Sequence, residues 1–344
     1  MNNDLTEIND LRNAFKNVTF SNYQKSKAKL ELINSIYKNK IEHACYWCAE
    51  FICSGNFLDL WDIIIFYMCK YIHQGNPKLA LYLNMRYDSF VSIVNNGYSN
   101  NIIILRNNLK IRKLFGEIIC ILCYSNKKHT YQTIKLNKNE EFDLINISNK
   151  FKAPNTNYLN DIFKENDPKE LFIPINELIF NITEKNIIDS CYWFEWILEY
   201  ENICKKKKKI CVCERRTYPP KLYNNDVIWI IWDIIFYFSN DMKKIYKIIN
   251  SLYSLFIIKY NPACKRKRKL IIYFAFSLIM DETNLNISIC NCNDKVDAIV
   301  SKIDNIYKDI KKNEISPKTD YLFKDVKKTN LEKTIEKIEI INNL

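Results

Sequence analysis

Apolar residues recur three and four positions apart over most of the chain, a spacing that places them on one face of an α-helix. The stretch Leu32–Ile52 shows this pattern most clearly. Two short apolar runs, Ile102–Leu105 and Ile271–Phe274, have the length of buried strands but lack alternating partners and hairpin turns. We therefore expect an all-α protein, with a few short strands as the alternative at such runs.

Two parts of the chain contain the same motifs in the same order. Residues 31–47 and 177–193 are identical at eight of seventeen positions, at a constant offset of 146. Two shorter motifs follow in both parts: Trp61-Asp62-Ile63-Ile64 with Trp232-Asp233-Ile234-Ile235, and Arg112-Lys113-Leu114 with Arg268-Lys269-Leu270. The ordered repetition predicts two tandem copies of one helical unit.

These copies divide the chain into four predicted parts. They are a first helical repeat at 1–136, a polar linker at 137–171, a second helical repeat at 172–285 and a C-terminal extension at 286–344. In the extension, apolar positions spaced by three and four predict amphipathic helices at Val296–Ile310 and Leu331–Ile341. We expect these helices to dock on the body of the protein or on a second copy of it.

Composition removes several classes of protein. The chain has four glycines, all before residue 117, so neither a glycine-rich phosphate loop nor a dinucleotide fingerprint can be drawn. Its histidines, His43, His73 and His129, follow no metal-ligand spacing. No apolar run approaches the roughly 18 residues of a membrane span, and we expect no membrane partner. The first residues show no secretory signal, so the thirteen cysteines are expected to be reduced.

Basic residues are concentrated in the second repeat. Residues 201–270 contain 17 Lys or Arg against 5 Asp or Glu, an excess of 12 that equals the net charge of the whole chain. Clustered cations bind a phosphate backbone because they release its condensed counterions. The predicted nucleic-acid contacts are Lys205, Lys206, Lys207, Lys208, Lys209, Arg215, Arg216, Lys265, Arg266, Lys267, Arg268 and Lys269.

Three tyrosines, Tyr218, Tyr223 and Tyr260, flank these clusters and are candidates for stacking on bases. Solvated loops and a nuclear-localisation signal are alternative interpretations of such basic runs. Binding to a membrane surface would need an amphipathic insertion helix beside the charges, and none is evident. We favour nucleic acid as the partner.

The cysteines form two kinds of pair. Two pairs with a two-residue gap lie inside apolar helical patterns, where thiols are expected to be buried core residues: Cys45 with Cys48, and Cys120 with Cys123. Four others lie in polar surroundings and could hold a structural zinc ion as thiolates: Cys211, Cys213, Cys290 and Cys292. Ordinary free thiols are the alternative, and no other cofactor is expected.

Asp62 and Asp233 recur in strongly apolar surroundings, where a lone carboxylate is costly and needs a cationic partner. The repeated Arg112 and Arg268, each followed by a lysine, are the candidate partners. We therefore predict one structural ion pair in each copy, Asp62 with Arg112 and Asp233 with Arg268. A catalytic carboxylate dyad is the alternative.

The segments Cys211–Arg216 and Asn313–Phe323 resemble those of uncharacterised proteins of giant nucleocytoplasmic, mimivirus-like DNA viruses, and the likeness extends along the whole chain. The resemblance implies a setting in the host cytoplasm, viral factory or virion, and it supplies no catalytic residues.

A second, fainter likeness is limited to part of the first repeat. It covers Ala44–Ala49 with Ser54-Gly55 and Ile118–Ser125 with Lys127-Lys128, and it is similar to the helical collar of clamp-loader-like recombination factors. It implies an oligomerising, replication-associated module, because the ATPase motif itself is absent.

The sequence thus predicts a non-enzymatic binding or assembly factor that contacts nucleic acid through the second repeat. In this hypothesis the first repeat or the C-terminal helices meet a protein partner or a second copy. A structural or host-interaction scaffold is the competing class. An enzyme would require Glu195, Glu199 and Asp189 to converge with cysteines on a metal.

Overall fold

The computed structural model describes residues 6–12, 15–137, 141–142, 147–159 and 162–315. The regular elements in this part of the chain are helical, which confirms the all-α class. Neither short apolar run is a strand. Ile102–Asn107 forms the 3-10 helix η4, and Ile271–Phe274 lie inside an α-helix that is buried from Leu270 to Met280.

The first half of the molecule is built from residues 25–124. Its α-helices are α1 (Lys25–Tyr37), α2 (Ile41–Cys53), α3 (Phe57–Tyr67), α4 (Leu79–Asn95) and α5 (Leu109–Tyr124). α2 packs against both α1 and α5. Asn108 caps α5, because its side-chain oxygen accepts hydrogen bonds from the backbone N–H groups of Lys110 and Ile111.

The second half, residues 172–280, places helices in a corresponding order. They are α7 (Phe172–Thr183), α8 (Ile187–Lys206), α9 (Ile228–Ser239), α10 (Lys243–Phe256), the one-turn α11 (Cys264–Lys267) and α12 (Lys269–Met280). α7 packs against α8 as α1 packs against α2. The short 3-10 helix η7 (Lys221–Tyr223) lies in the connection between α8 and α9.

The turn between the first two helices has the same backbone in both halves. Asn39 and Lys185, 146 positions apart, both adopt the left-handed conformation, with φ of 54° and 56°. The backbone hydrogen bonds that close the turn recur at the same offset, with donors Lys38, Asn39 and Lys40 in one half and Glu184, Lys185 and Asn186 in the other. The duplication hypothesis predicts this local identity; that the whole halves are copies stays a prediction.

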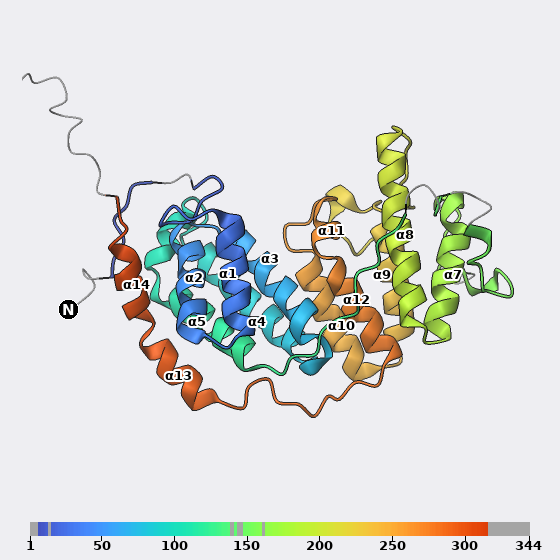
Figure 1. Ribbon diagram of the computed structural model, residues 1–344. Helices are drawn as coiled ribbons and strands as arrows, with labels where there is room; N and C mark the ends of the chain where they lie inside the picture. Colours follow the sequence, from blue (N-terminus) through green and yellow to red (C-terminus); the bar gives the residue numbers. More distant parts are fainter. Residues whose placement is uncertain (1–5, 13–14, 138–140, 143–146, 160–161, 316–344) are drawn as a thin grey trace, which may run out of the picture.

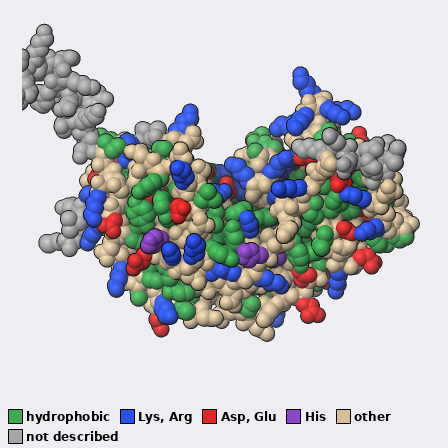
Figure 2. All heavy atoms as spheres, viewed as in Figure 1, with side chains coloured by type: hydrophobic (Ala, Val, Ile, Leu, Met, Phe, Trp, Pro, Cys, Tyr) green, Lys and Arg blue, Asp and Glu red, His purple; other side chains and the backbone are tan. Residues whose placement is uncertain are grey.

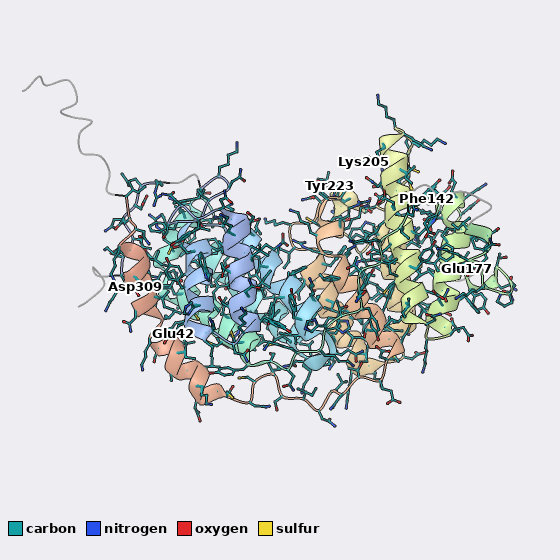
Figure 3. All side chains as sticks on the ribbon, in the orientation of Figure 1. Glu42, Phe142, Glu177, Lys205, Tyr223 and Asp309 are labelled. Carbon is teal, nitrogen blue, oxygen red and sulfur yellow. The ribbon has the colours of Figure 1, made fainter. Side chains whose placement is uncertain are left out.

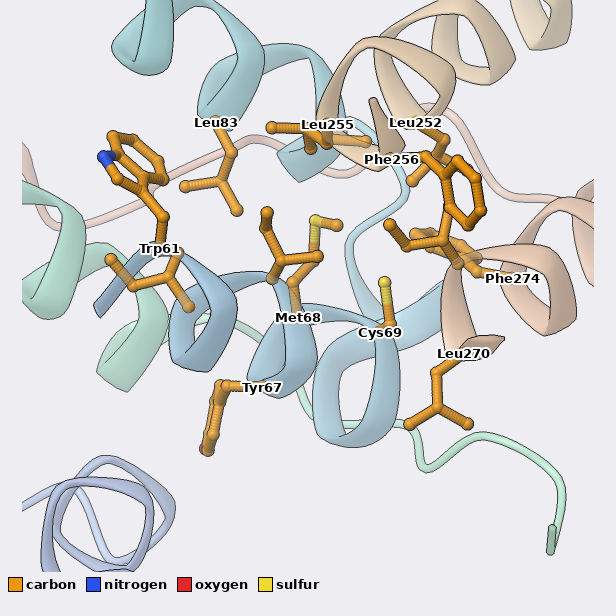
Figure 4. Packing of buried hydrophobic residues seen from close by; sticks show 14 of the residues in the cluster. Trp61, Tyr67, Met68, Cys69, Leu83, Leu252, Leu255, Phe256, Leu270 and Phe274 are labelled. Carbon is orange, nitrogen blue, oxygen red and sulfur yellow. The ribbon is translucent and has the colours of Figure 1, made fainter. Parts of the chain in front are cut away.

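The two halves lie side by side and share one hydrophobic interior (Figure 1). α4 packs against α10, and α12 packs against α3 and the turns that follow it. Figure 4 shows the fully buried side chains at this junction: Met68, Cys69 and Leu83 from the first half, and Leu252, Leu255 and Phe256 from the second. Their burial holds the halves together, because this apolar surface would otherwise be exposed to water.

The first half contains a segment between α3 and α4 that has no counterpart between α9 and α10. A π-helical turn, η2 (Met68–Ile72), and a 3-10 turn, η3 (His73–Gly75), extend α3 towards α12. His73 has φ 48° and ψ −127°, a conformation that is strained for a residue with a Cβ. A Cβ on Gly75 would lie 2.3 Å from the carbonyl oxygen of Asn126, so glycine allows the segment after α5 to cross here.

The predicted linker packs on the second half. Phe142 stacks on Trp196 with ring centroids 4.9 Å apart. The backbone N–H groups of Lys152 and Ala153 donate to the carboxylate of Glu177 in α7. Two 3-10 turns, η5 (Asn157–Leu159) and η6 (Lys169–Leu171), also contact α7. The described part of this segment therefore covers the second half.

The C-terminal extension returns to the first half (Figure 1). Its helices α13 (Asn293–Ser301) and α14 (Ile303–Lys311) pack on α5 and α2, and they bury Val296, Ile303, Tyr307 and Ile310. The expected docking on the body is confirmed for these helices, whose apolar face is covered within the chain. The predicted terminal helix Leu331–Ile341 lies outside the described residues.

Candidate nucleic-acid interface

The first basic cluster lies at the end of α8. This helix has 20 residues against 13 in α2, and its last turn, where Lys205 lies, projects past the neighbouring helices (Figure 3). All the side chains of Lys205–Lys209 are exposed. The negative end of the helix dipole stabilises the first of these cations, and repulsion among successive lysines favours their full hydration.

The second basic cluster is divided by the short helix α11. Lys265 is buried, and its Nζ atom lies 2.7 Å from Asp226 Oδ1. Lys265 also forms an ion pair with Glu201. Arg268 is buried, with its Nη2 atom 2.8 Å from Asp62 Oδ1. Its Nη1 group donates to the carbonyl oxygens of Phe256 and Ile258. The intervening Arg266 and Lys267 are exposed, because successive residues of a helical turn point in different directions.

Five of the twelve predicted phosphate contacts already have carboxylate partners. One of them, Arg266, stays exposed and pairs with Glu199 at 3.1 Å. Lys265 and Arg268 are buried structural residues, as is Arg216, whose guanidinium lies 2.8 Å from Asp167 and 2.7 Å from Asp233. Lys269 is half-buried and pairs with Glu195 at 2.6 Å. A buried cation needs carboxylate partners, and a count of charges along the sequence does not reveal which cations have found them.

Exposed basic residues from both halves meet at three adjoining hollows that Arg266 connects, which together we name the basic groove. Of the predicted contacts, the exposed Lys206, Lys207 and Arg215 do not line these hollows. One hollow, of about 470 Å³, lies between α1 and α3 on one side and α11 on the other. The other two, of about 700 Å³ and about 390 Å³, flank the second part of α8. Figure 2 shows Lys and Arg side chains around the hollow between the halves and on the projecting end of the second half. Besides Arg266, the basic lining residues are Lys25, Lys29, Lys135, Lys205, Lys208, Lys209, Lys265, Lys267 and Lys269.

Carboxylates neutralise part of this charge. The groove also contains Asp59, Asp62, Glu195, Glu199 and Glu201, which pair with Lys25, Arg268, Lys269, Arg266 and Lys265 respectively. Within the described residues, no carboxylate pairs with the exposed lysines Lys29, Lys135, Lys205, Lys208, Lys209 and Lys267. A phosphate backbone can reach these six cations without breaking an existing ion pair.

The first half thus supplies part of the groove, which the sequence analysis missed. Lys25 and Lys29 lie four positions apart on α1, and this spacing is a signal that could have placed both on one face. Nothing in the sequence indicates that this face lies opposite α11, because the arrangement depends on how the halves pack.

The tyrosines proposed for stacking are mostly engaged elsewhere. Tyr260 is buried and donates to Asp226 at 3.0 Å. Tyr218 donates to Asp233 at 2.8 Å and lines a different hollow. Tyr223 is half-buried, and its ring packs edge-on against the ring of Tyr260. It lies at the same end of the second half as Lys205 (Figure 3). Only Tyr223 keeps both partial exposure and a position near the lysines.

The predicted ion pairs are formed by other partners. Asp62 binds Arg268 of the other half, and Asp233 binds Arg216. Arg112 lies 3.3 Å from Asp304 of α14 and 4.0 Å from the ring centroid of Tyr307. All four predicted residues are thus in structural ion pairs, but the pairing of one carboxylate with one arginine inside each copy is wrong. The C-terminal extension supplies the partner of Arg112, and the packing of the halves brings Asp62 to Arg268. The connection between α8 and α9 supplies Arg216 for Asp233.

The cysteines with a two-residue gap are core residues, as predicted. Cys45, Cys48, Cys120 and Cys123 are buried, unbridged thiols where α2 packs against α5. Burial raises the pKa of Cys123 to about 12 and that of Cys48 further. The reactive thiolate form of Cys48 and Cys123 is therefore disfavoured at neutral pH.

The four cysteines proposed to bind zinc do not form a cluster. Cys213 is buried and its thiol donates to the carbonyl oxygen of Asp226, whereas Cys290 and Cys292 lie near Tyr124 of α5. In the described part of the chain, no group of three or more His, Cys, Asp or Glu side chains is placed to hold a metal ion.

The three carboxylates that a metal-dependent enzyme would need at one site are paired with cations instead. Glu195 and Glu199 pair with Lys269 and Arg266, and Asp189 pairs with Lys152.

Comparison with protein-family models gives no match, and comparisons with curated proteins and with solved structures give none either. Among the described helices, none is long and apolar enough to cross a membrane. Any function must therefore be argued from the groove itself.

Proposed function

We propose that the protein is a non-enzymatic binding factor that holds the phosphate backbone of a nucleic acid in the basic groove. The single observation that carries this proposal is the convergence of exposed lysines from α1, α8 and α11 on Arg266. The sequence resemblance extends the proposal to a large DNA virus, with the protein acting in the host cytoplasm, a viral factory or the virion.

The electrostatics of the groove support this partner. Six exposed lysines have no carboxylate partner in the described structure, and the chain carries a net charge of +12. Each phosphate that such a cation neutralises releases condensed counterions, so binding strengthens steeply as salt is lowered. A small anion would gain from one or two of these lysines, whereas a polyanion gains from all of them at once.

The test measures binding to a fluorescent oligonucleotide of about 20 nucleotides at salt concentrations from about 50 mM to about 300 mM. Fluorescence anisotropy reports the affinity at each concentration. We expect log K to fall linearly with log salt concentration. The triple variant Lys205→Gln, Lys208→Gln, Lys209→Gln should weaken binding at least about tenfold and reduce the steepness of that line by about 2 to 3.

A matched control carries the same loss of charge elsewhere in the second half: Lys243→Gln, Lys244→Gln, Lys247→Gln on the exposed side of α10. It should reduce the affinity far less, because none of these residues lines the groove. An affinity that does not depend on salt, or equal losses in both triple variants, would refute the proposal. A protein that binds no oligonucleotide but elutes as a defined oligomer would favour the scaffold class instead.

A further inference from the structure

We propose that the basic groove takes a single strand and that Phe66 is the ring on which one of its bases stacks. This inference rests on the proposed function and names the form of nucleic acid that the site prefers. Phe66 lies two positions after the first Trp-Asp-Ile-Ile motif, Trp61–Ile64, and is distinct from the three tyrosines that flank the basic clusters.

Phe66 lies in the part of the groove between the two halves. It belongs to the last turn of α3, it is half-buried, and it lines the hollow of about 470 Å³ together with Lys29 and Lys267. The neighbouring Ile64 and Ile65 are fully buried and fix the helix on the core. The ring is therefore held at the wall of the groove by a rigid element, as a stacking platform requires.

Two lysines lie beside the ring. Lys29 Nζ and Lys70 Nζ are each 5.3 Å from the Phe66 ring centroid. Such cation–π contacts at an exposed site are weaker than the stacking of a base on an aromatic ring. A base can therefore displace one lysine from the ring, and the displaced ammonium group remains close enough to bind an adjacent phosphate.

The position of the ring selects between single and double strands. In a duplex the faces of the bases are covered by their neighbours in the stack, and only base edges and phosphates are accessible. A ring in the wall of a basic groove gains stacking only from unpaired bases, as in other proteins that bind single strands without sequence preference. The lysines, in contrast, attract both forms.

The second half offers an internal comparison. Tyr237 lies at the corresponding place in α9, and it lines a hollow of about 710 Å³ with Asp233 and Asp241 and one lysine, Lys164. That hollow has aromatic rings but no excess of cations. A ring there should not contribute to nucleic-acid binding, so Tyr237→Ala is the matched control for Phe66→Ala.

The experiment compares a 5′-fluorescent oligothymidine of about 15 nucleotides with a duplex of the same length at one salt concentration. Phe66→Ala should weaken binding of the single strand about tenfold and that of the duplex less than about twofold, without changing the salt dependence, because no charge is lost. Phe66→Trp should restore the affinity for the single strand. Phe66→Leu, which keeps an apolar side chain of similar size, should behave as Phe66→Ala does.

Equal losses on both ligands, no loss on either, or full binding by Phe66→Leu would overturn the stacking inference. In each of these cases the lysine variants can still reduce binding, so the proposed function would stand without it. If instead Tyr237→Ala weakens the single strand as much as Phe66→Ala does, the assignment to this groove is wrong. Thermal unfolding of every variant identifies losses that come from misfolding.

Discussion

The two Trp-Asp-Ile-Ile segments begin from the same four residues and end in different structures. Trp61 and Trp232 are both fully buried, and neither indole N–H has a hydrogen-bond partner in the described structure. Asp62, in contrast, reaches across the molecule to Arg268 of the second half, whereas Asp233 stays within its own half and binds Arg216. The apolar positions repeat their role, and the charged position does not.

This difference shows which interactions a local motif specifies. An apolar side chain is satisfied by any close-packed apolar neighbour, so the same helical face is buried wherever the helix packs. A carboxylate needs a cation at a defined distance and angle. Arg216 lies in the long connection between α8 and α9, for which the first half has no equivalent, and it is Arg216 that takes Asp233.

The largest expected effect is at Arg216. Arg216→Met leaves Asp167 and Asp233 without their shared cation. We expect a loss of about 3–5 kcal/mol in the free energy of unfolding, because Arg216 and Asp167 are almost completely buried. Urea denaturation measures it. Arg215→Met, at the exposed neighbouring position, is the control and should change stability by less than about 0.5 kcal/mol. If Arg216→Met lowers the free energy of unfolding no more than Arg215→Met does, the ion pairs of Arg216 do not stabilise the second half.

The next effect concerns His73, in the segment that the second half lacks. Burial, assisted by Lys128, lowers the pKa of His73 to about 4 from an ordinary value near 6.5. As the pH falls, His73 is therefore protonated in the unfolded chain at a higher pH than in the folded chain. The free energy of unfolding should fall by about 1 kcal/mol per pH unit as the pH drops from about 6.5 to about 4, with no further loss from this group below that range.

His73→Gln should remove this part of the pH dependence, as measured by denaturation at pH values across the window. His43→Gln, at an exposed position in α2, should leave the dependence unchanged. If both variants keep the wild-type pH dependence, protonation of His73 does not affect the free energy of unfolding, and the segment found only in the first half adds no pH-sensitive group.

The smallest effect compares the same substitution in the two equivalent motifs. Asp62→Asn should cost about 1 kcal/mol, because Asp62 is partly exposed and Arg268 keeps the carbonyl oxygens of Phe256 and Ile258 as acceptors. Asp233→Asn should cost less. Burial raises the pKa of Asp233 although Arg216 and Tyr218 oppose the shift, so folding disfavours its ionised form, and a neutral amide avoids that penalty. The two values come from paired urea titrations, and the reverse order would contradict the comparison.

Helices and core were predictable because their signal is repeated many times along the chain. The apolar spacing in Leu32–Ile52 specifies a buried face over several turns, and the burial of Cys45 and Cys48 follows from the same pattern. The basic groove could be predicted only in part. Lys205–Lys209 are exposed as expected, but Lys29, Lys135 and Phe66 come from segments far apart in the sequence, and Arg216, Lys265 and Arg268 are buried among carboxylates.

The class of fold and the stretches where cations are numerous could be derived from the amino-acid sequence. These depend on spacing within one helix and on composition, which are local properties. Which cations are neutralised and which face the groove depends on the folded arrangement, because an ion pair forms only where two groups meet within about 4 Å. Such meetings across the two halves and the returning C-terminal helices depend on packing that no single segment encodes.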